Sequence, residues 1–149
     1  MSYIVRADIE AKFGVVNVAK WASLSATDGS TEITARVNAA IARATDEVND
    51  RLRGGYYVVP FTSPYPSDIV ELAATVAGLW LHDARGVEDM DANGKALDRL
   101  SVHRKLVEDH IAMLRTGERR LDTTVTYESM PSAGIPEVVT LGGLSPFKA

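Results

Sequence analysis

The sequence predicts an all-α protein, a small four-helix-type bundle with a short extended segment and a long extended C-terminal arm. Three observations support this prediction. Apolar residues recur every three or four positions through three long stretches of the first 117 residues, as they do on the buried face of a helix. A glycine follows each of these stretches, at positions 54, 86 and 117. After Gly117 the helical pattern stops, although apolar residues continue almost to residue 149.

Composition limits the class of protein. The 149 residues, 46% hydrophobic and 24% charged, suit one globular domain with a substantial core. A net charge of -4 argues against a protein whose main task is to hold phosphate backbones. The chain has no cysteine, which excludes disulfides and thiolate zinc sites and suits a reducing compartment. The most apolar stretch, Leu72–Leu81, is shorter than the roughly 17 residues that cross a bilayer, so we expect a soluble protein with no membrane partner.

The first elements are short. Residues Ala7–Phe13 predict a helix that ends at Gly14, and Val15–Leu24 predict a second one. A turn at residues 25–30 separates them from Thr31–Arg53, where the three-to-four spacing of apolar residues is sustained longest.

The middle of the chain combines an extended segment with an apolar helix. Aromatic and β-branched residues at Tyr56–Phe61 favour a short edge strand or a loop, with Pro60 limiting strand pairing. The next helix, Ser67–Arg85, has Glu71 as its only charge between Asp68 and His82. We therefore expect this helix at the buried centre of the bundle.

A last helix is predicted over Lys95–Thr116, with five residues facing inward: Leu97, Leu100, Val107, Ile111 and Leu114. The sequence thus divides into a helical core, residues 1–117, and a C-terminal arm, residues 118–149. The arm carries apolar side chains that the core does not need, and we expect them to form a partner interface: Leu121, Val125, Tyr127, Ile135, Val138, Val139, Leu141, Leu144 and Phe147.

One motif resembles a metal site without completing it. Asp89, Asp91 and Asn93, followed by Gly94, match the start of an EF-hand loop, but Leu100 stands where a bidentate glutamate belongs. We interpret this stretch as an acidic turn in which Asp91 or Asn93 caps the last helix, and we expect no metal and no cofactor.

No residue set predicts catalysis. His103 and His110 lie seven apart on one helix, about 10 Å along its axis, so one ion cannot bind both from there. His82, like them, fits a core-edge or surface position. The basic residues between Arg99 and Arg120 alternate with acidic ones, which favours a salt-bridged solvent face over a phosphate-binding one. We therefore expect no enzyme.

Four aromatic residues have two open interpretations. Tyr56, Tyr57, Phe61 and Tyr65 are flanked by glycines and prolines. They either cap the core of the bundle or form a subunit contact.

The order of motifs resembles a known family. The opening residues 3–14, the Asp28-Gly29 turn, residues 44–50 leading to Arg53 and Tyr57, and the Val59–Phe61 segment before the proline loop are similar to phage Mu-like virion proteins of the head-tail connector group. The resemblance covers residues 3–117.

This resemblance implies a structural role in the virion neck, at the head-tail junction, for a protein made in the host cytoplasm. The protein would be an adaptor, or head completion protein, forming a ring beneath the portal. The ring would have twelve copies, a tail-side connector or tail terminator protein as its further partner, and phage DNA only as passing cargo. The alternatives are another neck or tail-completion protein, or a small helical nucleic-acid-associated regulatory protein.

The arm has the reach that such assembly needs. Its 32 residues extend at most about 105 Å at about 3.3 Å each, so it can cross a neighbouring subunit. Residues 121–127 and 137–141 have strand-like patterns that suit pairing with an edge of the portal or of an adjacent copy. We expect these segments to become ordered only on assembly.

Overall fold

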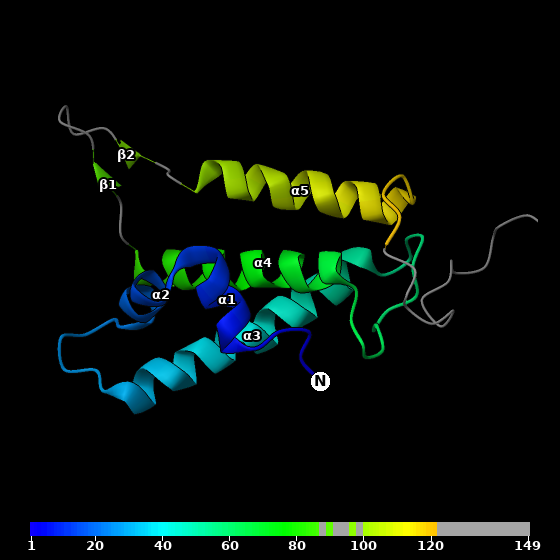
Figure 1. Ribbon diagram of the computed structural model, residues 1–149. Coiled ribbons are helices and arrows are strands. Elements are labelled where there is room, and N and C mark those ends of the chain that lie inside the picture. The colour runs from blue at the N-terminus through cyan, green and yellow to red at the C-terminus, as the bar shows by residue number, and fades with distance from the viewer. Residues whose placement is uncertain (87–88, 91–95, 98–99, 122–149) are drawn as a thin grey trace, which may run out of the picture.

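The computed structural model describes residues 1–86, 89–90, 96–97 and 100–121. Within these ranges it contains α1 (Arg6–Phe13), α2 (Val15–Ala22), α3 (Ser30–Leu52), α4 (Ser67–Arg85) and α5 (Ser101–Thr116), with the two-residue strands β1 (Asp89–Met90) and β2 (Ala96–Leu97). Figure 1 shows α4 between α3 and α5, with α1 and α2 packed across one side of this layer. The predicted all-α class is confirmed.

Helix α4 is the centre of the fold, as its sequence predicts. Every residue from Leu72 to Leu79 is buried, so the helix is covered on all sides over two turns. It contacts each of the other four helices. Small residues make this possible, because alanines and Gly78 let neighbouring helices approach closely from several directions.

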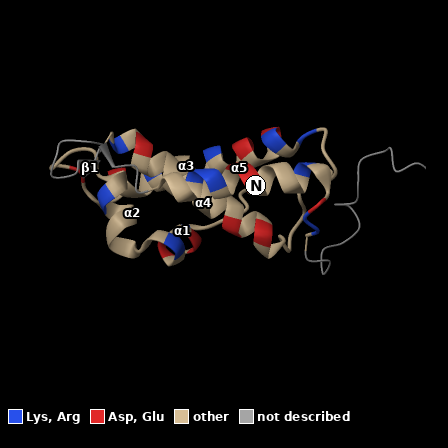
Figure 2. Cartoon of the chain, turned by 90° about the horizontal axis from the view of Figure 1, so that it is seen from above, with Lys and Arg blue, Asp and Glu red and all other residues tan. Residues whose placement is uncertain are grey.

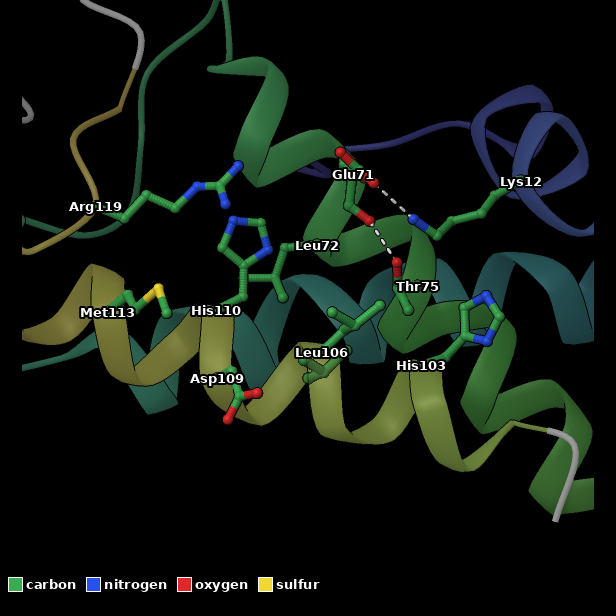
Figure 3. A pocket seen from close by; sticks show the side chains of 11 residues that line it. Lys12, Glu71, Leu72, Thr75, His103, Leu106, Asp109, His110, Met113 and Arg119 are labelled. Carbon is green, nitrogen blue, oxygen red and sulfur yellow. Dashed lines mark hydrogen bonds and ion pairs between the residues drawn. The ribbon is translucent and has the colours of Figure 1, made fainter.

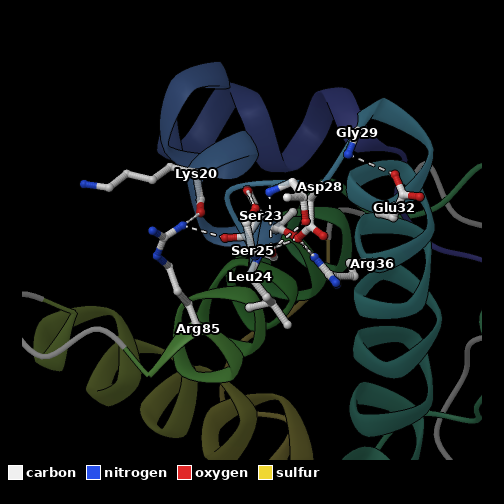
Figure 4. A network of polar contacts seen from close by, with 11 residues as sticks. Lys20, Ser23, Leu24, Ser25, Asp28, Gly29, Glu32, Arg36 and Arg85 are labelled. Atoms are coloured by element: carbon white, nitrogen blue, oxygen red, sulfur yellow. Dashed lines mark hydrogen bonds and ion pairs between the residues drawn. The ribbon is translucent and has the colours of Figure 1, made fainter.

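Two arginines fix the end of α2 (Figure 4). Arg85 of α4 donates hydrogen bonds to the carbonyl oxygens of Lys20 and Ser23, the latter at 2.7 Å. Arg36 of α3 donates to the carbonyl of Ala22 at 2.9 Å and to the Asp28 carboxylate. These contacts satisfy the carbonyl groups that a helix leaves unpaired at its C-terminus. They tie α2 to both long helices that follow it.

Asp28 organises the turn after α2. Its carboxylate accepts hydrogen bonds from the backbone N–H groups of Leu24 and Ser25, each at 2.8 Å, in addition to the Arg36 contact. The hydrogen bond from Arg36, followed by the one from Ser25, lowers the pKa of Asp28 below its ordinary value. Helix α3 then begins where the Glu32 carboxylate accepts a hydrogen bond from Gly29 N–H at 2.9 Å.

The connection from α3 to α4 is a loop with cis peptide bonds at Val59–Pro60 and Ser63–Pro64. Of the two interpretations of its aromatic residues, core packing holds for Tyr57 and Phe61, which are 8% and 2% exposed. Tyr56 and Tyr65 are half-buried and pack against the same core. The rings contact one another and Tyr3 edge-on or tilted, so the loop closes one end of the bundle.

The predicted start of the last helix is wrong by six residues. Ala96 and Leu97 pair with Asp89 and Met90 as an antiparallel hairpin, and α5 begins only at Ser101 with Leu100 as its N-cap. The intervening sequence contains Asn93-Gly94, a dipeptide that favours tight hairpin turns over helix. Capping of the helix by Asp91 or Asn93 is therefore also wrong.

Candidate assembly surface on helix α5

Helix α5 has two apolar stripes, and the described residues cover only one of them. Val107, Ile111 and Leu114 are buried against α3 and α4, at 5% exposure or less. Val102, Leu106 and Met113 lie on another face of the helix, spaced by four and seven residues, and are 64%, 58% and 42% exposed. We call these three residues the α5 ridge. A helix apolar on two faces has a second surface available for packing.

Two residues of the α5 ridge, Leu106 and Met113, line a groove of about 280 Å³ between α5, α4 and the end of α1. Among its lining residues Leu72 and Val107 are buried, while Leu106 and Met113 are exposed. Figure 3 shows Leu72 of α4 opposite Leu106 of α5. The sequence analysis did not identify this groove. The sequence does contain an indication of this second apolar stripe, because positions 102, 106 and 113 share a helix face that does not include 107, 111 and 114.

Two ion pairs lie along the inner wall of the groove. Lys12 Nζ is 2.8 Å from Glu71 Oε1, and the guanidinium of Arg119 donates two hydrogen bonds to Asp68, at 2.8 and 3.1 Å. The hydrogen bond from Lys12 is the main cause that lowers the pKa of Glu71, and that from Arg119 does the same for Asp68. Both cations of the groove, Lys12 and Arg119, are thus paired within the subunit, and the exposed carboxylate of Asp109 also lines the groove.

Two histidines of α5 also line the groove. The His103 ring lies 5.3 Å from the Phe13 ring, and the His110 ring lies beside Arg119 and Leu72 (Figure 3). His103 Nδ1 and His110 Nε2 are buried and have no hydrogen-bond partner within the described part of the chain. Burial, followed by the charge of Arg119, lowers the pKa of His110, against the opposing effects of Asp68 and Glu71.

We predict a loss of stability in mild acid that depends on His110. Its folded-state pKa lies below the ordinary value of 6.5, so as pH falls from about 7 to 5 the unfolded chain takes up the proton first and the free energy of unfolding decreases. The carboxylates of Asp68 and Glu71, whose pKa values are lowered, contribute stability that is lost only below about pH 4.5. Urea unfolding at each pH measures the slope between pH 7 and 5. His110→Gln should flatten it, and equal slopes for the two proteins would contradict the prediction.

Two residues of the predicted basic face, Arg104 and Arg119, are ion-paired in the structure, and so is Arg51 of α3. Arg104 pairs with Asp83, Arg51 with Glu47 and Glu108, and Arg119 with Asp68. A second hollow of about 220 Å³, between α3, α4 and α5, is lined largely by these paired groups. Figure 2 shows positive and negative residues interleaved along the helices. Along the helices drawn in this view, basic residues do not follow one another in the continuous stripe that holds nucleic acid.

The core continues four residues beyond the predicted boundary at Gly117. That glycine has a φ of +78° and lies against the Tyr56 ring, where a side chain would collide. Beyond it, Leu121 N–H donates to the Tyr57 hydroxyl at 3.0 Å, and the hydroxyl donates to the Arg119 carbonyl at 3.3 Å. Leu121, predicted as a partner-interface residue, is 5% exposed and buried in its own subunit. The reason is that Tyr57 supplies both an apolar surface and a hydroxyl at this point.

The other predicted arm residues, Val125, Tyr127, Ile135, Val138, Val139, Leu141, Leu144 and Phe147, lie outside the described residues. So do Asp91 and Asn93 of the EF-hand-like stretch, while the backbone of Asp89 pairs with Leu97. Among the described residues, no three histidine or acidic side chains are grouped closely enough to hold a metal ion. No described helix has both the length and the hydropathy of a membrane span.

Comparison with known proteins identifies the family. A family model described as Bacteriophage Mu, Gp36 matches residues 3–139. The matched range contains the whole bundle from Tyr3 to Leu121 and continues through most of the arm. No curated protein matches the chain. Since the match covers far more than half of the sequence, the chain belongs to the phage protein family Bacteriophage Mu, Gp36.

Proposed function

We propose that this protein is a structural virion protein of the head-tail connector. In this proposal it is an adaptor that forms a ring beneath the portal of a tailed phage and joins head to tail, and DNA passes through the lumen. Membership of a phage family supports the general class. The observation that carries the specific role is the α5 ridge, an apolar stripe that no described element covers, on a helix whose other stripe already completes the core.

A ring needs a surface that binds a different surface on the next copy, because such head-to-tail contacts close into a cycle. The α5 ridge is one such surface, and the apolar C-terminal arm is the other. In the proposed neck, twelve copies match the portal, the arm contacts the portal or an adjacent subunit, and a tail-side connector or tail terminator protein binds the opposite end. A net charge of -4 and ion-paired arginines suit a lumen along which DNA slides without being held.

Another neck or tail-completion protein is the nearest alternative, because such a protein also assembles through apolar surfaces and arms. Electron microscopy of virions with a labelled chain would separate the two by position. A nucleic-acid-associated regulatory protein has less support. Its binding face would be the one between Arg99 and Arg120, and two of the guanidinium groups there, those of Arg104 and Arg119, already pair with carboxylates of their own subunit.

Removal of the arm tests the proposal. A protein that ends at Leu121 keeps the Arg119–Asp68 pair and the Tyr57 hydrogen bonds, so it should unfold at nearly the same urea concentration as the full chain. It should bind assembled portal from the same phage at least about tenfold more weakly, because the apolar contacts of residues 122–149 are lost. Light scattering or surface plasmon resonance measures the affinity. Absence of portal binding by the full chain would refute the connector role, and equal binding by both forms would refute the role of the arm.

A further inference from the structure

The groove beside the α5 ridge has the shape and chemistry of a peptide-binding site. Its lining residues on α5 extend from His103 to Met113, with the buried Leu72 and Val107 and the exposed Leu106 and Met113 among the apolar ones. Side chains spaced along a helix, facing a second helix across a groove, form a line of pockets that an extended or helical segment can fill. The site is therefore suited to a length of polypeptide.

The charges of the groove indicate what kind of polypeptide fits. Lys12 and Arg119 are already paired with Glu71 and Asp68, so neither cation is available to hold a strongly charged ligand without breaking an existing contact. Apolar side chains and backbone amides remain as the favourable occupants. His103 Nδ1 and His110 Nε2 have no hydrogen-bond partner among the described residues. If either ring turned toward the groove, its nitrogen could bond to a peptide backbone, which carries both donors and acceptors.

The chain itself contains such a polypeptide. Residues 122–149 include eight large apolar residues of the predicted interface but only four charged ones, Asp122, Glu128, Glu137 and Lys148. At about 3.3 Å per residue, these 28 residues reach at most about 92 Å, several times the length of α5. The segment is long enough and apolar enough to cover the α5 ridge of another subunit.

The described chain ends close to the end of the groove that Arg119 lines. Leu121 is held by the Tyr57 hydroxyl, on the loop that closes the end of the bundle. The Arg119 side chain reaches from this exit to Asp68 and forms one end of the groove (Figure 3). In the proposed ring the next copy presents the same groove, and the reach of at most about 92 Å allows the segment to cross from this exit to that groove.

We infer that the groove between α4 and α5 of one subunit binds the C-terminal segment, residues 122–149, of another copy of the same chain. The inference deepens the proposed connector function, since it names the contact between adjacent copies of the ring. The groove and the segment are different surfaces of one chain, so each copy both donates a segment and accepts one.

Thiol crosslinking in the full-length protein tests this inference, because the chain has no cysteine and every introduced thiol is unique. A Leu106→Cys protein is mixed with a second protein carrying Val125→Cys, Ile135→Cys or Leu141→Cys, and mildly oxidised. In the control, Ala42→Cys, at an exposed position on α3, replaces Leu106→Cys. At least one mixture with Leu106→Cys should form a bridged dimer about tenfold faster than the control forms with the same partner. Rates equal to the Ala42 control in all three mixtures would overturn the inference.

Two further measurements make the result specific. Met113→Glu added to the Leu106→Cys protein should abolish the fast crosslink, whereas Ala112→Glu, on the same helix but outside the groove, should leave it intact. When one chain carries thiols at both positions 106 and 141, a crosslink that forms only within that chain at every dilution would overturn binding between copies.

Portal binding is assayed on the same proteins. Portal binding without the crosslink refutes this inference alone, and the crosslink without portal binding refutes only the connector role.

Discussion

Replacement of Gly78 by alanine is expected to destabilise the protein by about 2–3 kcal/mol, although glycine to alanine in a helix interior ordinarily stabilises by about 1 kcal/mol. Gly78 is buried in the middle of α4, and the edge of the Phe13 ring lies where its side chain would be. An added Cβ would stand 2.1 Å from Phe13 Cε2, far inside contact distance. The ring also packs edge-on against Trp21 at 5.4 Å, so it has little room to move.

The destabilisation should depend on Phe13, and a double-mutant cycle measures this. Phe13→Ala alone leaves a cavity and lowers the free energy of unfolding, while Gly78→Ala in the Phe13→Ala background should cost less than about 0.5 kcal/mol because the collision is absent. Urea unfolding of the four proteins supplies the values. If Gly78→Ala were as stable as the original chain, the close packing of α1 on α4 would be incorrect. That packing also positions Lys12 at the groove, since Lys12 precedes Phe13.

The long helices could be predicted closely because each is defined by local signals. Helix α4 has the predicted bounds, and α3 differs from its prediction by one residue at each end. Their apolar periodicity extends over many turns, and glycine or proline marks the limits. The start of α5 was wrong because Ala96 and Leu97 fit a helical pattern as well as a strand, and only their pairing with Asp89 and Met90 decides between the two.

The candidate assembly surface on α5 could not be predicted in the same way, for a related reason. The apolar residues after the last helix predict an interface in the arm. Whether a given side chain is buried, however, depends on contacts with residues far away in the sequence. Leu121 is buried because Tyr57, sixty-four positions earlier, receives it. Leu106 is exposed because no described element packs over that side of α5. Periodicity shows that a residue belongs to an apolar stripe, but it does not show which stripe finds a partner.

The N-terminal Tyr3 is expected to have the second large effect. Its ring is 4% exposed and packs edge-on against Phe61 and Tyr65, with centroids 5.8 and 5.0 Å away. Its hydroxyl accepts a hydrogen bond from the Phe61 N–H at 3.0 Å and donates one to Asn49 of α3. Tyr3→Ala should therefore cost about 3–5 kcal/mol, while Tyr3→Phe, which removes only the hydroxyl, should cost about 1–2 kcal/mol.

The two Tyr3 variants also separate packing from the position of the arm. Phe61 packs against Tyr3, and its ring centroid lies 6.3 Å from that of Tyr57. The Tyr57 hydroxyl in turn accepts the hydrogen bond from Leu121 N–H. If this series of contacts fixes the exit of the C-terminal segment, Tyr3→Phe should speed amide exchange at Phe61 and Leu121 while leaving the centre of α4 protected. Unchanged exchange at Leu121 would show that Tyr57 holds the exit without Tyr3. Faster exchange would mean that the N-terminal residues of the fold set where the arm leaves the subunit, and with it the direction from which a neighbouring groove is reached.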